Sequence, residues 1–249
     1  MKQKYTLGLA LVASAALALG CKPRQDAASA SSSQAQAGEG VVALGGKTCE
    51  VVEMIEDAEN ADNQVIKAGN RNGYIYTYVD KEGTTVEPQA GELGGTFVMA
   101  EGGAKGSGYA LRMTGTIATA SITYAGMGMN FLDPKGVYDA SQYDGISFFI
   151  RKAPETTARV RLKVPDKNTD PDGGVCQECF NDFGTDMTVK DEWTQYIVPW
   201  SAMTQMQGWG NPRPPAIEPA TVTSIQFQVA DKGQNFDVWV DNVAFIKCQ

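Results

Sequence analysis

The sequence predicts an all-β fold, a β-sandwich or jelly roll, for most of this 249-residue chain. Residues 159–164 and 224–229 alternate strictly between polar and apolar side chains, the period of a strand with one buried face. Residues 146–150, 193–198 and 236–240 are rich in β-branched and aromatic side chains. No amphipathic run of helical period exceeds about two turns, and Gly and Pro separate the strands. Many short strands spaced by turn residues are typical of a sandwich or jelly roll.

The first 20 residues predict an export signal. Lys2 and Lys4 come before an uncharged, mostly apolar run over 5–20 that ends at Cys21. This run is shorter than the ~20 apolar residues of a membrane span, and a polar tail follows it. The residues directly before Cys21 resemble the lipobox of bacterial lipoproteins, which implies that Cys21 is lipidated and becomes the mature N-terminus. An ordinary signal peptide with a chance cysteine is the alternative.

Residues 21–46 are rich in Ala, Ser, Gln and Gly and predict a flexible tether. They lack the apolar content that would offset the entropy of ordering the chain. Residues 47–249 are then one domain, of a size normal for a single β-sandwich. Because Lys22 follows the cysteine, the sorting rule of enteric Gram-negative bacteria implies the outer membrane, so we expect an outer-membrane or cell-surface location.

The composition excludes several kinds of chemistry. The chain has no histidine, which removes Ser-His-Asp and Cys-His catalysis, imidazole-based zinc sites and histidine pH switches. The formal charge is −8, and loss of Lys2 and Lys4 with the signal peptide brings it to near −10. Such a surface repels nucleic acid and anionic lipid, whereas it suits calcium or neutral ligands such as sugars.

Four cysteines remain when Cys21 is set aside. The simplest pairing joins Cys49 to Cys248 at the ends of the domain and Cys176 to Cys179 within a loop. The first bond closes a loop of about 200 residues and contributes on the order of 4–5 kcal/mol in the chain-entropy model. Two alternatives stay open: a redox CxxC motif, although no thioredoxin-like pattern surrounds it, and a zinc site in which all four thiolates meet.

Six segments form an ordered set over nearly the whole of 50–246. They are IEDAE (55–59), GNRNGYIYTYVD (69–80), YDASQYDGISFFIR (138–151), RVRLKVPD (159–166), EWTQYIVPWSAM (192–203) and FDVWVDNVAFI (236–246). Together they resemble the galactose-binding-like jelly rolls, which include family 11 carbohydrate-binding modules, although Ala58 stands where the first motif usually has an aromatic residue. The resemblance implies a jelly-roll β-sandwich that binds polysaccharide or glycan on one sheet face.

A sugar site of this kind uses aromatic rings for the apolar face of a sugar, and amides and guanidinium groups for its hydroxyls. The ligand-binding residues that we expect are Tyr74, Tyr76, Arg159, Arg161, Asp166, Trp209, Gln226 and Gln228, with Lys163 on the same strand face as the arginines. The alternative is that the tyrosines pack in the core and that the polar side chains form an ordinary solvated face. We expect Trp193 and Trp239 in the core.

Calcium is the cofactor that the resemblance implies. A structural Ca²⁺ would lie between the first and last strands, held by Glu59 and Asp241 with Asp57 as a helper, because hard cations prefer carboxylate oxygens. Solvated acids near the chain ends are the alternative. The loop 166–174 also has half of an EF-hand pattern, but counted from Asn168 its twelfth position is Cys179 instead of glutamate, and counted from Asp166 its sixth is Pro171. This loop is a looser calcium loop, a ligand-binding rim or an Asx-rich turn without a ligand.

Three functions stay open at this point. The first is a lipid-anchored carbohydrate-binding module outside the cytoplasm, and the second is a structural or adhesive surface lipoprotein with the same fold and no sugar site. The third is a polysaccharide-active enzyme, because a carboxylate pair hydrolyses glycosides without histidine. The acids available for it are Asp166, Asp170, Asp172, Glu178 and Asp182. The sequence contains no nucleophile elbow, phosphate loop or cofactor fingerprint.

Overall fold

The computed structural model describes residues 40–46, 48–60, 62–91, 97 and 99–249. Within these ranges the chain forms thirteen β-strands and four short 3-10 turns, without an α-helix. No helix in the described part is therefore long and apolar enough to cross a bilayer. The predicted signal peptide, Cys21 and most of the predicted tether lie outside the described residues.

The strands follow one another with short 3-10 turns between some of them. They are β1 (Gly40–Ala43), β2 (Cys49–Glu56), β3 (Ile75–Val79), β4 (Thr85–Glu87), β5 (Ala100–Glu101), β6 (Tyr109–Thr116), β7 (Ala125–Asn130), β8 (Gly145–Lys152), β9 (Arg159–Val164), β10 (Phe183–Thr188), β11 (Thr194–Pro199), β12 (Ser224–Val229) and β13 (Asn235–Cys248). The 3-10 turns are η1 (Ala104–Gly106), η2 (Pro171–Gly173), η3 (Trp200–Ala202) and η4 (Pro219–Thr221).

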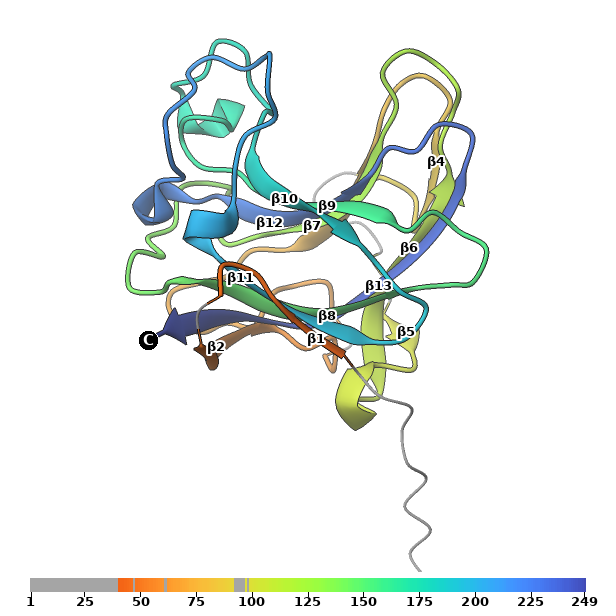
Figure 1. The fold of residues 1–249 in the computed structure, drawn as a ribbon, viewed down its shortest axis with the longest axis horizontal. Helices are drawn as coiled ribbons and strands as arrows, with labels where there is room; N and C mark the ends of the chain where they lie inside the picture. Colours follow the sequence, from red (N-terminus) through yellow and green to blue (C-terminus); the bar gives the residue numbers. More distant parts are fainter. Residues whose placement is uncertain (1–39, 47, 61, 92–96, 98) are drawn as a thin grey trace, which may run out of the picture. The chain divides into compact units, whose positions relative to one another are not determined.

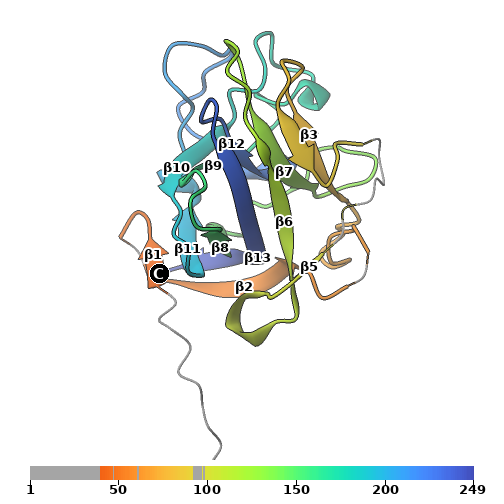
Figure 2. The ribbon, with the colours of Figure 1, turned by 90° about the vertical axis from the view of Figure 1, so that its right-hand side faces the viewer.

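Two sheets pack face to face, as Figures 1 and 2 show from two directions. The larger sheet has the order β1-β11-β8-β13-β6-β4, with β2 also paired to β13 and β5 to β6. The smaller sheet has the order β10-β9-β12-β7-β3. Strands that follow one another in the chain seldom pair, and β2 lies antiparallel to β13 near the C-terminus. The predicted jelly-roll β-sandwich is confirmed.

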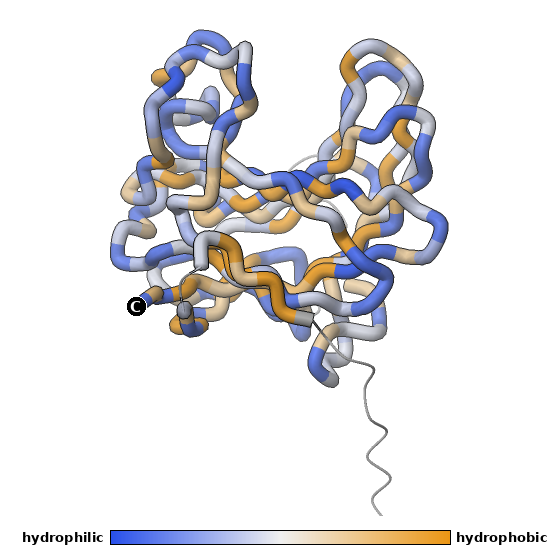
Figure 3. Tube along the Cα trace, viewed as in Figure 1, coloured by the Kyte–Doolittle hydropathy of each residue, from blue (hydrophilic) through white to orange (hydrophobic). Residues whose placement is uncertain are grey.

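The core lies between the sheets and is built by the apolar positions of alternating strands. In β9, Val160, Leu162 and Val164 are buried, and in β12 Ile225 and Phe227 are buried against them. Both strands begin and end where the period-2 pattern predicts. Figure 3 shows the same separation along the chain, with apolar stretches in the two layers and hydrophilic stretches in the loops above them.

The folded part begins before the point that composition predicts. Residues 40–43, within the predicted tether, form β1, which runs parallel to β11 at the edge of the larger sheet. Val42 and Leu44 pack against the core, so two apolar side chains and a row of backbone hydrogen bonds order this short segment. The Ala/Ser-rich composition of the neighbouring residues hides this signal.

Both predicted disulfides are present. Cys49 and Cys248 join β2 to the end of β13 with a Cα–Cα distance of 4.0 Å, across a sequence separation of 199. Cys176 and Cys179 bridge a separation of 3 within the connection from β9 to β10. The structure thus excludes a zinc site formed by all four thiolates. Two disulfides are typical of proteins that fold outside the reducing cytoplasm.

Candidate functional site

An open groove of about 760 Å³ lies over the outer face of the five-stranded sheet, the face turned away from the core. Side chains of β3, β12 and β9 form its floor. Loops rise at both ends of these strands (Figure 1). We call residues 176–181 and 206–211 the disulfide wall, and residues 117–124, which connect β6 to β7, the opposite wall.

Two glycines of β7 give the floor its shape. Gly126 and Gly128 alternate with buried apolar residues and therefore face the groove. A Cβ atom on Gly126 would lie 2.3 Å from Cζ of Tyr78, and one on Gly128 would lie 2.7 Å from Cζ of Tyr76. Real Cβ atoms essentially never approach so closely. Glycine at these positions is what lets the two tyrosine rings lie across the strand.

Four tyrosines form a continuous row along one side of the floor. Their ring centroids are separated by 5.9 Å between Tyr74 and Tyr76, 6.2 Å between Tyr76 and Tyr78, and 6.1 Å between Tyr78 and Tyr124. These spacings lie within the favourable range for aromatic pairs. All four side chains are half-buried. The row therefore offers a partly exposed aromatic surface on which an apolar ring face can pack.

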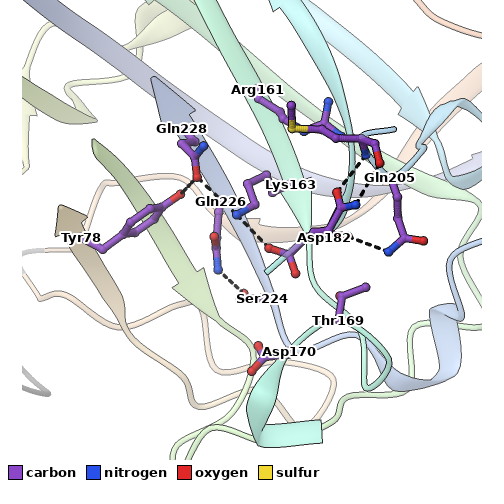
Figure 4. A network of polar contacts seen from close by, with 12 residues as sticks. Tyr78, Arg161, Lys163, Thr169, Asp170, Asp182, Gln205, Ser224, Gln226 and Gln228 are labelled. Carbon is purple, nitrogen blue, oxygen red and sulfur yellow. Dashed lines mark hydrogen bonds and ion pairs between the residues drawn. The ribbon is translucent and has the colours of Figure 1, made fainter. Parts of the chain in front are cut away.

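Each tyrosine over a glycine is opposite a glutamine of β12. Gln226 Nε2 donates to the Tyr76 hydroxyl at 3.2 Å. The Tyr78 hydroxyl donates to Gln228 Oε1 at 3.4 Å (Figure 4). In the sheet register one glycine lies between the two members of each pair. The absence of a glycine side chain thus allows aromatic and amide groups to meet across the intervening strand.

A buried ion pair continues this network toward β9. Lys163 Nζ donates to Gln228 Oε1 at 3.3 Å and lies 2.8 Å from Asp182 Oδ2 (Figure 4). The side chains of Lys163 and Asp182 are only 10% and 2% exposed. Asp182 Oδ1 is buried and has no hydrogen-bond partner among the described residues. An unpaired buried acceptor of this kind is costly.

Carboxylates offset most of the positive charge around the groove. Arg161 Nη1 donates to Asp186 Oδ2 at 3.1 Å, and Lys135 Nζ lies 2.6 Å from Asp170 Oδ2. Lys232 at the rim donates to a backbone carbonyl at 2.9 Å. Together with the buried ion pair of β9, these contacts make the groove polar but close to electrically neutral. An uncharged ligand with many hydroxyls suits such a surface better than a strongly charged one.

Burial raises the pKa of the tyrosines on the floor. The pKa of Tyr76 rises to about 12, and that of Tyr78 lies well above its usual value. The pKa of Tyr74 is also raised, again chiefly by burial. The phenols are therefore neutral at physiological pH, so each keeps a proton to donate and lone pairs to accept.

Backbone hydrogen bonds join the two loops of the disulfide wall. The N–H groups of Gln177 and Glu178 donate to the carbonyl of Asn211 at 2.8 and 3.2 Å, and Asn211 N–H donates back to Glu178 at 3.1 Å. The Cys176–Cys179 disulfide closes the turn that carries the first two donors. The wall is thus one braced unit of two chain segments.

Asn181 fixes Trp209 in this wall. Its Nδ2 donates to the carbonyl oxygens of Trp209 at 2.6 Å and Met206 at 2.9 Å, while its Oδ1 accepts from Met206 N–H at 2.9 Å. Asn181 is buried, whereas Trp209 is half-buried and lines the groove. A side chain that is saturated with backbone partners positions the loop that carries the tryptophan.

Most of the ligand-binding residues predicted from sequence meet in this groove. Those that line it are Tyr76, Arg161, Trp209, Gln226 and Gln228, and Tyr74 extends the tyrosine row. Arg159 lies beyond them in an adjoining hollow of about 300 Å³, where it is exposed and 3.3 Å from Asp231. The alternative that these tyrosines pack in the core does not hold, because the core is on the other face of the sheet.

Asp166 lies apart from the groove and holds its own loop together. Its buried carboxylate accepts from the N–H groups of Asn168 and Glu218, each at 3.0 Å. Asp170 caps the short turn η2 by accepting from Asp172 N–H at 3.0 Å. These contacts are those of an Asx-rich turn, one of the three interpretations of loop 166–174. Burial raises the pKa of Asp166, despite these donors.

Several groove residues escape the sequence analysis. Tyr78 has the same strand parity as Tyr74 and Tyr76, so period-2 reasoning carried two residues further would have found it. Tyr124, Ile122, Phe180 and Met206 also line the groove. Most of these residues lie in loops, where no periodic pattern in the sequence indicates which way a side chain points.

Of the two tryptophans expected in the core, Trp239 is buried and Trp193 is half-buried, but neither belongs to the cluster between the two sheets. Trp239 is 8% exposed, but it alternates with the core residues of β13 and packs between Arg112 and Arg151 on the outer face of the larger sheet. Trp193 is half-buried and packs on the other side of Arg151. Guanidinium groups stacked on indole rings bury these side chains without a place between the sheets.

The expected calcium ligands lie near the junction of β2 and β13, but not as a cluster. Among the described residues no group of three or more acidic, cysteine or histidine side chains is arranged to hold a metal. Asp57 Oδ1 accepts from Glu59 N–H at 3.2 Å, and Glu59 Oε1 accepts from Tyr109 N–H at 2.9 Å. Asp241 Oδ2 accepts from Ser107 Oγ and from Ala104 N–H, each at 2.7 Å.

Glu56, which the sequence analysis did not select, is the more informative acid at this junction. It is buried, its Oε2 has no hydrogen-bond partner among the described residues, and burial raises its pKa to about 8. Burial likewise raises the pKa of Asp241 to about 6. Two desolvated carboxylates that repel each other fit a hard cation. Glu56 thus offers an unpaired carboxylate oxygen, but among the described residues no group of three such ligands forms around it.

Neither a protein-family model nor a curated protein matches the sequence. Solved structures do match the fold. The family 11 module of the cellulosomal cellulase Lic26A-Cel5E of Clostridium thermocellum is 19% identical, with a TM-score of 0.52 over 79% of this chain and 95% of that one. The C. thermocellum family 11 module in complex with a β-1,3-1,4-mixed-linked tetrasaccharide is 18% identical, with a TM-score of 0.54 over 78% and 95%. The described domain has the fold of the family 11 carbohydrate-binding modules.

A third structure, the solution structure of CtCBM11, gives the same result. It is 18% identical, with a TM-score of 0.54 over 83% of this chain and 99% of that one. The resemblance inferred from ordered motifs is thereby confirmed at the level of the fold. At this identity the side chains of the groove have to be argued from the chain itself.

Proposed function

We propose that the groove binds a single chain of neutral polysaccharide. The observation that carries this proposal is the tyrosine row on a glycine floor, faced by two glutamines of β12. The rings provide apolar surface for the CH face of a sugar, and the amides and phenols provide directed partners for its hydroxyls. The chain supplies both kinds of group on one surface, as sugar recognition requires.

The size and charge of the groove support a chain of several sugars. The floor strands from β3 to β9 are separated by three inter-strand gaps, about 14 Å at about 4.8 Å each. The positive side chains around the floor are largely matched by carboxylates. A long, nearly neutral, polar groove is suited to an extended uncharged polymer.

Affinity electrophoresis tests this proposal. The first probe is β-1,3-1,4-mixed-linked glucan, the linkage type of the tetrasaccharide bound by a family 11 module of similar fold, and a panel of other neutral and carboxylated polysaccharides follows. We expect retention on a neutral polymer and its loss in Tyr76→Ala, Tyr78→Ala and Trp209→Ala. Tyr109→Ala is the matched control, because Tyr109 is 41% exposed and lies outside the groove.

One outcome would contradict the proposal, and a second would add a catalytic activity to it. If no polysaccharide retards the protein, the domain is a structural or adhesive module with this fold and without a sugar site. If a labelled polysaccharide is shortened, and a single carboxylate substitution stops this, the protein is an enzyme. Asp182 is the first carboxylate to change, since it lines the groove.

We also propose that lipid on Cys21 anchors the domain outside the cytoplasm. The support is the lipobox-like sequence before Cys21 and the two disulfides of the domain. Expression in a Gram-negative host with radiolabelled palmitate should label the wild-type protein in the membrane fraction. Cys21→Ser should remain unlabelled and appear in the soluble fraction; label on that variant, or a soluble wild-type protein, would contradict the anchor.

We further propose that Glu56 and Asp241 hold Ca²⁺, with Asp57 and Glu59 at its rim. The bound ion would neutralise two buried carboxylates and link β2 to β13. Calcium at 100 times its Kd should stabilise the protein by about 2.7 kcal/mol relative to chelator. Glu56→Gln should abolish this gain, whereas Glu50→Gln, an exposed change on the same strand, should keep it. An unchanged thermal midpoint in calcium would contradict the site.

A further inference from the structure

Two exposed apolar side chains stand over the groove from different walls. Ile122 of the opposite wall is 72% exposed, and Phe180 of the disulfide wall is 62% exposed. Both line the groove, and the two walls rise on either side of it (Figure 1). Exposed apolar side chains of this size are unfavourable in water. A ligand in the groove would cover both of them and remove this cost.

Phe180 is also held in an unfavourable backbone conformation. Its φ is +74°, in the left-handed region that side chains with a Cβ rarely adopt. Its neighbours impose this conformation: Cys179 before it is in the disulfide, Asn181 after it is bound to two carbonyls, and Phe180 N–H donates to Thr169 at 2.8 Å. Strain of this kind persists where the surrounding structure fixes it, and it clusters at ligand sites.

We propose that Phe180 and Ile122 are apolar lips that contact the upper side of the bound polysaccharide, and that the Cys176–Cys179 disulfide positions Phe180 for this contact. The proposal rests on the function proposed above and identifies residues that determine how the same groove retains its ligand. The sugar chain is then held on three sides, by the tyrosine row below and by one lip from each wall.

The Cys176–Cys179 disulfide should fix the conformation of the disulfide wall more than it stabilises the folded domain. It closes a separation of only 3 residues, against 199 for Cys49–Cys248, so it restricts the unfolded chain much less. Within the wall it precedes Phe180 directly and closes the turn whose backbone binds Asn211. Its removal should therefore loosen one lip and leave the β-sandwich folded.

Binding kinetics with a soluble oligosaccharide of the best-retained polysaccharide test the lips. Phe180→Ala and Ile122→Ala should each raise Kd by about 3- to 10-fold, the range of one aromatic or apolar contact. The change should appear mainly as faster dissociation, because the lips act after the chain has entered. Val175→Ala is the control in the same loop, 44% exposed and outside the groove, and should stay within about twofold. Unchanged dissociation in both lip variants would overturn the proposal.

The positioning role of the disulfide needs a separate comparison. Cys176→Ser/Cys179→Ser should raise Kd about threefold with a nearly unchanged thermal midpoint, and it should have no further effect when Phe180→Ala is already present. An equal loss of affinity in both backgrounds would show that the disulfide does not act through Phe180. If wild-type protein binds no polysaccharide, the proposed function and the lips fail together.

Phe180→Gly separates strain from contact. Glycine adopts the observed φ without penalty, so this variant should have a higher thermal midpoint than Phe180→Ala while losing affinity to the same extent. A glycine variant that is no more stable than the alanine variant would contradict the assignment of strain to Phe180. Full affinity in the glycine variant would exclude Phe180 as a ligand contact.

Discussion

The two faces of the five-stranded sheet use the same strands for opposite purposes. In β12, Phe227 packs edge-on against Phe148 in the core, with ring centroids 4.9 Å apart, while Gln226 and Gln228 on either side face the groove. The inner face is apolar and buried, and the outer face combines rings, amides and an ion pair with space above them. The comparison shows that alternate residues of one strand have different roles: those on the inner face stabilise the fold, and those on the outer face are available to bind a ligand.

Phe227→Ala should have the largest effect on this comparison. Removal of a fully buried phenylalanine leaves a cavity between the sheets and lowers the free energy of unfolding by about 3–5 kcal/mol. Urea denaturation measures this loss. Gln228→Ala, one residue along and on the other face, should cost less than about 1 kcal/mol of stability and should weaken polysaccharide binding instead. Equal destabilisation by both changes would contradict the division between faces.

The ion pair of Lys163 and Asp182 should affect both stability and binding, because it is buried and also borders the groove. Lys163→Met leaves the Asp182 carboxylate buried without its partner and should lower the free energy of unfolding by about 3 kcal/mol. The double variant Lys163→Met/Asp182→Leu removes the buried charge and should recover most of this stability. Polysaccharide binding should stay weak in both variants, as affinity electrophoresis measures. Recovered binding in the double variant would exclude this pair from the site.

Strand parity is also the part of the structure that sequence reasoning predicts well. The alternation in 159–164 and 224–229 places Arg161, Gln226 and Gln228 on the groove face, where the structure has them. The cysteine pairings follow from spacing and export, and both are present. These features depend on local pattern, so a single sequence contains the information.

The walls of the groove depend on contacts that no local pattern encodes. Phe180 faces the groove because residues 176–181 bind a loop that lies about 30 positions further along the chain. Trp239 is predicted in the core from its type, whereas its partners Arg112 and Arg151 come from two other strands. At the β2–β13 junction the sequence favours Asp57 and Glu59, while burial selects Glu56. Long-range register and loop packing decide these cases.

Gly126→Ala should affect the groove face more than the core face. Its Cβ would lie 2.3 Å from the ring of Tyr78, so the ring must move away from the floor. We expect polysaccharide Kd to rise by about tenfold, the effect of losing one well-placed aromatic contact, with only a small change in stability. Gly136→Ala is the matched control, because a Cβ there meets its nearest atom at 3.8 Å. Isothermal titration with the bound oligosaccharide measures both; equal affinities would show that the flat floor is not needed.

The smallest expected effect is a titration confined to the groove face. Burial raises the pKa of Tyr76 to about 12, from 10.0, so the folded protein keeps a proton that the unfolded chain releases between these values. Stability that is present below pH 10 is therefore lost as the pH rises through 12. In Tyr76→Phe the free energy of unfolding should fall less steeply with pH, by a slope that corresponds to up to about one proton. Urea denaturation from pH 9 to 12 measures this slope. Polysaccharide affinity should stay constant from pH 6 to 9, since the phenols remain protonated there. An equal slope in the phenylalanine variant and the wild type would contradict this prediction. It would mean that Tyr76 ionises as readily in the folded protein as in the unfolded chain.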